Sequence, residues 1–304
     1  MHLSRLLLTS VTAVSVFASA CSSSSTSPTP TPVPPHLYAA EPDVNQVAAL
    51  PLPLSAASVP AFNISGFNFN SGVAFDVAQN LYVSNTSGPS IAVFAPPYSA
   101  ASAPTFTIAG GSSGLSTPEQ IGFDASGDLW VADQTNKVIK YTPPFSAASA
   151  PALHVMTGLS SPQGVAFDVA ANLYVADNTG LLAMFASPYA GAPITTANGL
   201  QFPLAVITDS AHVYVADFGK KGVVAYTTPI AAAQAPAFTI TTGLTNGPHG
   251  LAFDSAGNLY VSTNGGEIVV YAPPFSAAST PTFTIPCFES PATNCLTRQM
   301  AFGP

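Results

Sequence analysis

The sequence predicts an all-β fold: a six-bladed β-propeller of four-stranded blades, closed by its C-terminal strand joining the N-terminal blade. Three observations predict it. Apolar residues make up 47% of the 304 residues and are rich in Val, Ile, Phe and Tyr, which favour strands. Thirty Pro and 22 Gly supply many turns. A strand-like motif recurs along the chain, and the two chain ends supply complementary parts of one more copy.

The repeated motif reads "GVAFDVAQNLYVSN" in its first full copy, residues 72–85. Four more copies occupy 120–133, 164–177, 204–217 and 250–263. The central aromatic residues of the five copies stand 48, 44, 40 and 46 residues apart, and a further Tyr precedes them by 44: Tyr82, Trp130, Tyr174, Tyr214 and Tyr260, with Tyr38 before them. Strand-rich repeats of this length are typical of propellers and solenoids.

Each repeat divides into four strands. "VAF" is apolar throughout, as in a strand buried on both faces, and "DxxGN" is a tight turn whose Asp accepts backbone N–H groups. "LYVAD" is the second strand, segments such as "IAVFA" are the third, and "TFTI" alternates like a half-exposed outer strand. The connector before it, "PPFSAAS", ends the third strand with Pro and is expected to form one helical turn capped by its first Ser. It recurs because every blade needs this corner; a ligand-binding motif is the alternative.

The chain ends complete one blade. "HLYAAE" (36–41) matches a second strand without a first, and "MAF" (300–302) matches a first strand without a second. We therefore expect 300–302 to supply the innermost strand of the blade built from about 36–69, since closure removes free sheet edges. The other blades are expected at about 70–118, 119–162, 163–203, 204–248 and 249–297.

Charge excludes some partners. Six Lys and Arg residues face 14 Asp and Glu residues, for a net charge of −8. Binding to nucleic-acid phosphates or an anionic membrane needs clustered basic residues, and those of this chain are scattered. We expect no nucleic-acid partner, membrane contact through a lipid anchor only, no cofactor and a monomer.

The first 35 residues predict export. Residues 1–20 have a basic start and an apolar segment too short for a membrane span, as in a signal peptide. "ASAC" (18–21) resembles a bacterial lipobox, in which the Cys, here Cys21, becomes the lipidated first residue; Ala18 stands where that pattern usually has Leu. Residues 21–35 then comprise the lipidated Cys and a Ser/Thr/Pro tether. The prediction is a propeller of residues 36–304, lipid-anchored to the bacterial cell envelope; ordinary secretion after cleavage near "ASA" is the alternative.

Two further cysteines stand late in the chain. Cys287 and Cys295 in an exported protein predict a disulfide. A zinc site is the rival interpretation, but two Cys with no nearby His make a poor ligand set.

The pattern "GVAFDxxxNLYVAD" resembles that of the NHL-repeat family of β-propellers over residues 36–304. The resemblance implies the propeller fold. NHL-type propellers include protein-binding modules, lyases and lactone hydrolases, so the resemblance leaves the function open.

The positions just before the first strands are the candidate site, because they are expected to meet at one channel mouth. They are Ser71, Glu119, Gln163, Pro203, His249 and Arg298. Glu119 and His249 come from opposite blades and could divide acid and base catalysis; Arg298 could hold a carboxylate, with Ser71 and Gln163 as further ligand contacts. A polar rim satisfied by water is the alternative. Amidating-type lyases on similar propellers hold zinc with three channel His, and this ring has one, so no metal is expected.

These observations predict a non-enzymatic binding or scaffold propeller whose protein or small-molecule partner is unknown. The alternative is a channel-mouth lyase or lactone hydrolase, of the streptogramin-lyase or gluconolactonase-like kind, that uses Glu119 and His249. A purely structural envelope protein is a third hypothesis. The uniformity of the repeats favours binding, since catalytic sites usually break local rules.

Overall fold

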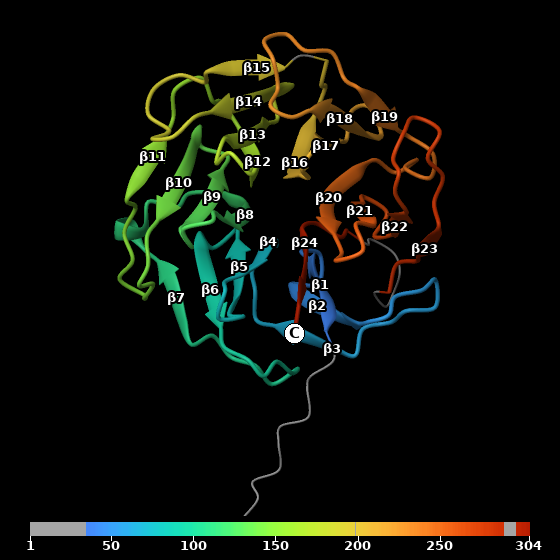
Figure 1. Ribbon diagram of the computed structural model, residues 1–304. Helices are drawn as coiled ribbons and strands as arrows, with labels where there is room; N and C mark the ends of the chain where they lie inside the picture. Colours follow the sequence, from blue (N-terminus) through green and yellow to red (C-terminus); the bar gives the residue numbers. More distant parts are fainter. Residues whose placement is uncertain (1–34, 198, 289–295) are drawn as a thin grey trace, which may run out of the picture. The chain divides into compact units, whose positions relative to one another are not determined.

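Residues 33–304 form one compact unit in the computed structural model, which describes residues 35–197, 199–288 and 296–304. The described residues form 24 β-strands and one short 3-10 helix, η1 (Gly111–Ser113). The strands make six four-stranded antiparallel sheets arranged around a common centre (Figure 1). The fold is therefore an all-β, six-bladed propeller, as predicted.

Some predictions fall outside the described residues. The predicted signal peptide, Cys21 and nearly all of the predicted tether lie in residues 1–34, and Cys295 of the predicted disulfide lies in 289–295. Within the described residues, no helix is long and apolar enough to cross a membrane.

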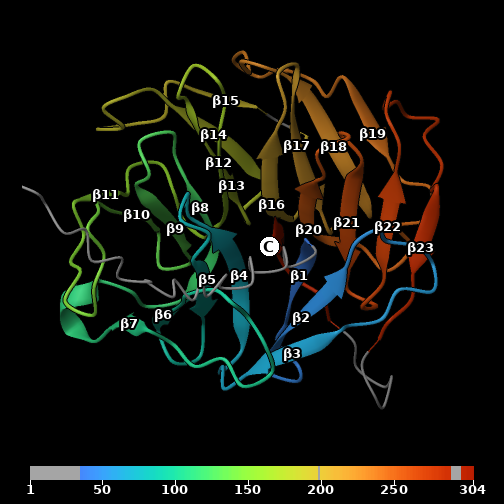
Figure 2. The ribbon, with the colours of Figure 1, turned by 60° about the horizontal axis from the view of Figure 1, so that its bottom comes forward.

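In every sheet the strand nearest the centre pairs with the next strand outward (Figures 1 and 2). Named from the inside outward, the first two blades are β24 (Met300–Gly303), β1 (His36–Glu41), β2 (Gln46–Pro51) and β3 (Phe62–Ser65), then β4 (Asn70–Phe75), β5 (Leu81–Asn85), β6 (Ser90–Phe94) and β7 (Phe106–Ala109). The next two blades are β8 (Pro118–Phe123), β9 (Leu129–Asp133), β10 (Lys137–Tyr141) and β11 (Leu153–Val155), then β12 (Pro162–Phe167), β13 (Leu173–Asp177), β14 (Leu181–Phe185) and β15 (Thr195–Ala197). The last two blades are β16 (Pro203–Thr208), β17 (His212–Asp217), β18 (Gly222–Thr227) and β19 (Phe238–Ile240), then β20 (Pro248–Phe253), β21 (Leu259–Thr263), β22 (Ile268–Tyr271) and β23 (Phe283–Ile285).

The two ends of the described chain close the ring. Strand β24 pairs antiparallel with β1, with Phe302 opposite Leu37 and Ala301 opposite Tyr38. The backbone N–H of Ala40 donates to Gln299 O at 3.1 Å and continues this pairing beyond the strand. The predicted composite blade is thus confirmed, with "HLYAAE" as its second strand.

The apolar core lies between neighbouring blades rather than within them. Each of six buried clusters joins residues of two adjacent sheets. At one interface Tyr82 packs edge-on against Phe123 of the next inner strand and Phe145 of the next connector, with ring centroids 5.0 and 5.7 Å apart. Equivalent aromatic contacts surround Tyr38, Trp130 and Tyr214. The connector motif therefore recurs because its aromatic residue fastens one blade to the previous one.

The connector forms a single turn, and the first Ser caps it as predicted. Its Ser-Ala-Ala-Ser segment is one hydrogen-bonded turn, with Ser102 N–H donating to Ser99 O at 3.0 Å. In the copy at 99–102, Ser99 Oγ accepts a bond from Ala101 N–H, and Ser102 Oγ accepts one from Ser99 N–H. The two hydroxyls accept hydrogen bonds from backbone N–H groups of the turn, so the turn does not need to continue into a longer helix.

The aspartates of the "DxxGN" turns use both carboxylate oxygens as acceptors. In Asp168 one carboxylate oxygen accepts the N–H groups of Ala170 and Asn172, and the other accepts the hydroxyl of Tyr174 at 2.9 Å. Four more blades repeat this arrangement with a Tyr or Trp donor: Asp76, Asp124, Asp209 and Asp254. In the composite blade the hydroxyl of Tyr38 donates to Pro304 O at 2.6 Å instead.

Candidate functional site

A β-bulge at the start of each of five inner strands positions the candidate residues. The strand registers shift between Asn70 and Val73 in β4 and at the equivalent points of β8, β12, β16 and β20. The first strands therefore start earlier than "VAF". Five of the predicted positions lie inside these strands and not before them as predicted: Ser71, Glu119, Gln163, Pro203 and His249. A bulge re-aims a side chain, and here it turns all of these residues except Pro203 toward the channel.

The structure brings five of the six predicted residues into one pocket at this end of the channel. Ser71, Glu119, Gln163, His249 and Arg298 all line it. Pro203 is buried but does not line it, and its neighbours Leu204 and Ala205 do. Five of the six positions thus lie close together, and the roles of these residues remain predictions.

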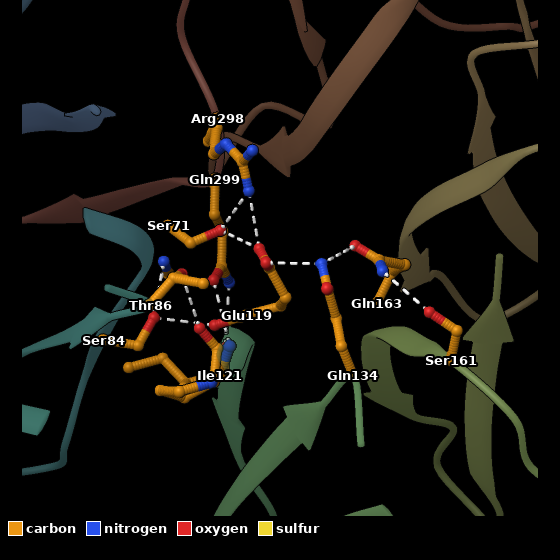
Figure 3. A network of polar contacts seen from close by, with 12 residues as sticks. Ser71, Ser84, Thr86, Glu119, Ile121, Gln134, Ser161, Gln163, Arg298 and Gln299 are labelled. Carbon is orange, nitrogen blue, oxygen red and sulfur yellow. Dashed lines mark hydrogen bonds and ion pairs between the residues drawn. The ribbon is translucent and has the colours of Figure 1, made fainter. Parts of the chain in front are cut away.

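Glu119 is held by three donors (Figure 3). Arg298 Nη1 lies 2.6 Å from its Oε2, and the hydroxyl of Ser71 also donates to Oε2. Gln134 Nε2 donates to Oε1 at 2.7 Å and contacts Gln163 Oε1 at 3.3 Å. The carboxylate that Arg298 holds is thus Glu119 itself, because the ion pair is formed inside the protein.

Burial shifts both titratable groups of the predicted acid–base pair. It raises the pKa of Glu119 above its ordinary value, against the lowering effects of Arg298 and Ser71. Burial, helped by the nearby Arg298 charge, lowers the pKa of His249 to about 3. The imidazole is therefore neutral at physiological pH and is a weak base, far from the pKa near 7 that suits a general base.

The pocket is very small. Its volume is about 20 Å³, which is room for about one water molecule. One donor remains there, because Arg298 Nε is buried without a hydrogen-bond partner among the described residues. The remaining guanidinium surface packs on Phe69, with Cζ 4.8 Å from the ring centre. The pocket as it stands accepts a water molecule and not a substrate. No cluster of three His, Cys, Asp or Glu side chains able to hold a metal occurs among residues 35–197, 199–288 and 296–304.

Two glutamines that the sequence interpretation missed close the channel below this pocket. Gln299 Oε1 accepts the N–H groups of Val73 and Ile121, both at 3.1 Å, and its Nε2 donates to Ile121 O at 2.9 Å. Gln120 makes an equivalent pair of bonds with the backbone of Val206 on β16. The two amides thereby join inner strands of different blades across the channel, and Figure 3 shows Gln299 beside Ile121.

Glycines make space for these side chains. A Cβ on Gly164 would lie 2.5 Å from Gln120 Oε1, and one on Gly72 would lie 3.0 Å from Gln299 Oε1. At this position of the repeat, Gly alternates around the ring with a longer residue: Gly72, Gln120, Gly164, Leu204, Gly250 and Gln299. This alternation was the signal in the sequence that could have revealed the two glutamines, Gln120 and Gln299, that close the channel.

Comparisons with known proteins identify the fold. A family model described as strictosidine synthase-like, N-terminal, matches residues 236–271, from just before β19 to the end of β22. No curated protein matches the chain at a significant level.

Three solved structures share the architecture at low sequence identity. A chain in the crystal structure of a nidogen/laminin complex is 20% identical, with a TM-score of 0.69 over 89% of this chain and 98% of that one. A protein of unknown function from Bacteroides caccae is 12% identical, with a TM-score of 0.64 over 89% and 99%. A streptogramin B lyase is 11% identical, with a TM-score of 0.53 over 85% and 76%. These likenesses show the propeller fold and leave the function undecided between binding and catalysis.

Proposed function

We propose that the chain is a lipid-anchored, extracytoplasmic propeller of the NHL type that acts as a binding or scaffold module and not as an enzyme. The observation that carries this proposal is the closed polar mouth of the channel. The Glu119 carboxylate at this mouth is already bound by Arg298, Ser71 and Gln134. The pocket volume of about 20 Å³ is too small for a substrate. A propeller in a nidogen/laminin complex has a similar fold, which is consistent with a role in protein binding.

An enzyme is the second candidate, because Glu119 and His249 do line one pocket. A streptogramin B lyase shares the fold. For catalysis at this site, Arg298 would have to leave Glu119 so that a substrate could enter between the two side chains. The neutral imidazole would then accept a proton, and the carboxyl group, with its raised pKa, would supply one.

Partner capture and turnover separate the two candidates. Wild-type protein and the His249→Ala variant are displayed on whole cells, cross-linked, and compared for the partner recovered; both are also incubated with a panel of lactones. The binding proposal expects the same partner with both proteins and no turnover by either. Turnover by the wild type that His249→Ala abolishes would establish the enzyme instead.

The anchor is proposed from "ASAC" and the Ser/Thr/Pro segment that follows it. Cells are fed a labelled fatty acid, and the protein is recovered from membrane and soluble fractions. The wild type and a Cys287→Ser control are expected to carry label in the membrane fraction, whereas Cys21→Ser is expected to carry none. Unlabelled wild-type protein in the medium would favour ordinary secretion.

A further inference from the structure

The opposite end of the channel holds a much larger cavity. The inner strands run from the polar mouth, where β4 begins at Asn70 beside Ser71, to this end, where β4 ends at Phe75. Here the ends of β4, β8, β12, β16 and β24 line a bowl of about 390 Å³. Gln120 and Gln299 line both this bowl and the polar pocket. The bowl is therefore a dead-ended cavity floored by two amides, within the size range of small-molecule sites.

The lining of the bowl is uncharged and combines apolar side chains with polar groups. Every residue that lines it is aliphatic, aromatic, Gly, Thr or Gln. Four half-buried phenylalanines are among the lining residues: Phe75, Phe123, Phe167 and Phe302. Each amide nitrogen of the floor donates one bond within the protein, so one N–H of each is left over among the described contacts. Such a site favours an apolar body of limited length.

Four aspartates form a rim just beyond the residues that line the bowl, and their carboxylates accept hydrogen bonds from their own turns. An Asp follows directly after the lining strand ends of β4, β8, β12 and β16, at Asp76, Asp124, Asp168 and Asp209. Asp76 and Asp124 line an adjoining groove of about 400 Å³ that shares Phe75 and Phe123 with the bowl.

Little positive charge offsets this rim. Among the described residues only Asp209 of the four has a basic neighbour, His212 at 3.9 Å. Lys140 is paired with Asp128 and not with any of the four. Although burial acts to raise it, hydrogen bonds from Asn172, Tyr174 and Ala170 lower the pKa of Asp168 below its ordinary value. Asp168 therefore stays ionised near neutral pH, and its charge repels anions from the bowl.

We propose that the bowl binds an apolar organic cation, whose hydrocarbon body lies against the phenylalanine rings and whose ammonium group faces the aspartate rim. Aromatic faces attract cations through their quadrupoles, and the rim carboxylates add a longer-range attraction. A neutral molecule of the same shape gains only the apolar contact, and an anion also meets the repulsion. This site goes beyond the partner binding proposed above, at the opposite mouth of the channel.

Three probes with one apolar body test the charge requirement. 4-Phenylbutylamine, 4-phenylbutan-1-ol and 4-phenylbutyrate are titrated into the 33–304 unit at neutral pH by calorimetry. We expect the amine to bind about three- to tenfold more tightly than the alcohol, the range that a cation–π contact supplies, and the acid not to bind. Added salt should weaken only the amine.

Two glycine variants place the site. Gly122 lines the bowl, and a Cβ there meets only Val165 O at 3.9 Å, so Gly122→Leu is chosen to add side-chain volume to the bowl. Gly111 lies outside the bowl with open space around it, and Gly111→Leu is the matched control. Amine binding should be lost in Gly122→Leu and kept in Gly111→Leu, with melting temperatures showing that both are folded.

Equal binding of amine and alcohol overturns the proposal. So does amine binding that persists in Gly122→Leu, or an amine that fails to bind the wild type up to its solubility limit. None of these outcomes affects the capture of a partner by the propeller, so they leave the proposed function intact.

Discussion

The two ends of the central channel are built from the same inner strands, yet they differ in how much open volume their side chains leave. At the polar mouth, Glu119 and Arg298 satisfy each other, and about 20 Å³ remains. At the bowl, phenylalanine rings face about 390 Å³ of open volume. The comparison teaches that charged residues around a pocket do not by themselves make a reactive site. The larger open volume lies at the end whose residues drew no attention in the sequence.

Deleting residues 300–304 tests both ends at once and should have the largest effect. It removes β24, which pairs with β1 and contributes Phe302 to the bowl. The exposed edge and the lost interface core should abolish cooperative unfolding or lower the melting temperature strongly, as followed by circular dichroism. The control is Val77→Ser, at a side chain that is 96% exposed. A truncated protein that melts with the wild type would show that the ring does not depend on this strand.

Replacing Gln299 by Ala should remove one of the two amides that separate the polar pocket from the bowl. The change removes three hydrogen bonds and leaves the buried N–H groups of Val73 and Ile121 without partners. We expect a loss of about 2–3 kcal/mol in the free energy of unfolding, measured by urea titration. Gln201→Ala, at an exposed glutamine, should change little. Equal effects of the two substitutions would show that the amide bridge contributes nothing.

Two glycines on neighbouring inner strands give a sharper comparison. A Cβ on Gly164 would lie 2.5 Å from Gln120 Oε1 and 2.9 Å from Val206 N, whereas one on Gly122 has its nearest contact at 3.9 Å. Gly164→Ala should therefore cost about 1–3 kcal/mol through overpacking. Gly122→Ala should be neutral or slightly stabilising, because Ala is less flexible than Gly when unfolded. The reverse order in urea titrations would contradict the close approach.

The pH dependence of stability isolates His249. Its folded pKa of about 3 lies below the ordinary value of 6.5, so the unfolded chain binds the proton more tightly. The stabilising effect of the neutral form is complete above pH 6.5 and is lost as the pH falls, by on the order of 1 kcal/mol per unit at most. His249→Phe should flatten this part of the profile. Glu119, with a raised pKa, acts in the opposite direction and is common to both proteins. Identical profiles would show that His249 titrates normally.

Much of the fold was predictable from the sequence because each blade repeats the same local chemistry. The period of the central aromatics, the Asp turns and the complementary chain ends led to the six blades and to the closing strand. The exact starts of the inner strands were not predictable, since the bulges at Ser71, Glu119 and His249 depend on pairing with the next strand.

The residues that line the site were predictable from the sequence, but the hydrogen bonds and ion pairs among them were not. Aligning the repeats placed Glu119, His249 and Arg298 at one mouth, because equivalent positions of a propeller meet at its axis. Rotamers decide whether the arginine reaches a ligand or Glu119, and no repeat pattern contains that information. The two glutamines that close the channel were visible in the sequence, because Gln120 and Gln299 replace the Gly found at this position in other repeats. Their role depends on hydrogen bonds to other blades, and the repeat pattern does not contain this information.

The unfolding free energy of Glu119→Gln tests the central claim most directly. Residues that serve catalysis are often held at a cost in stability, so replacing them commonly stabilises a protein. A structural ion pair behaves in the opposite way, because its loss leaves a buried charge unpaired. With Glu267→Gln as the control at a partly exposed carboxylate outside the channel, the account predicts a loss of about 3 kcal/mol for Glu119→Gln only. A variant as stable as the wild type, or more stable, would contradict the closed mouth and return Glu119 to the list of catalytic candidates.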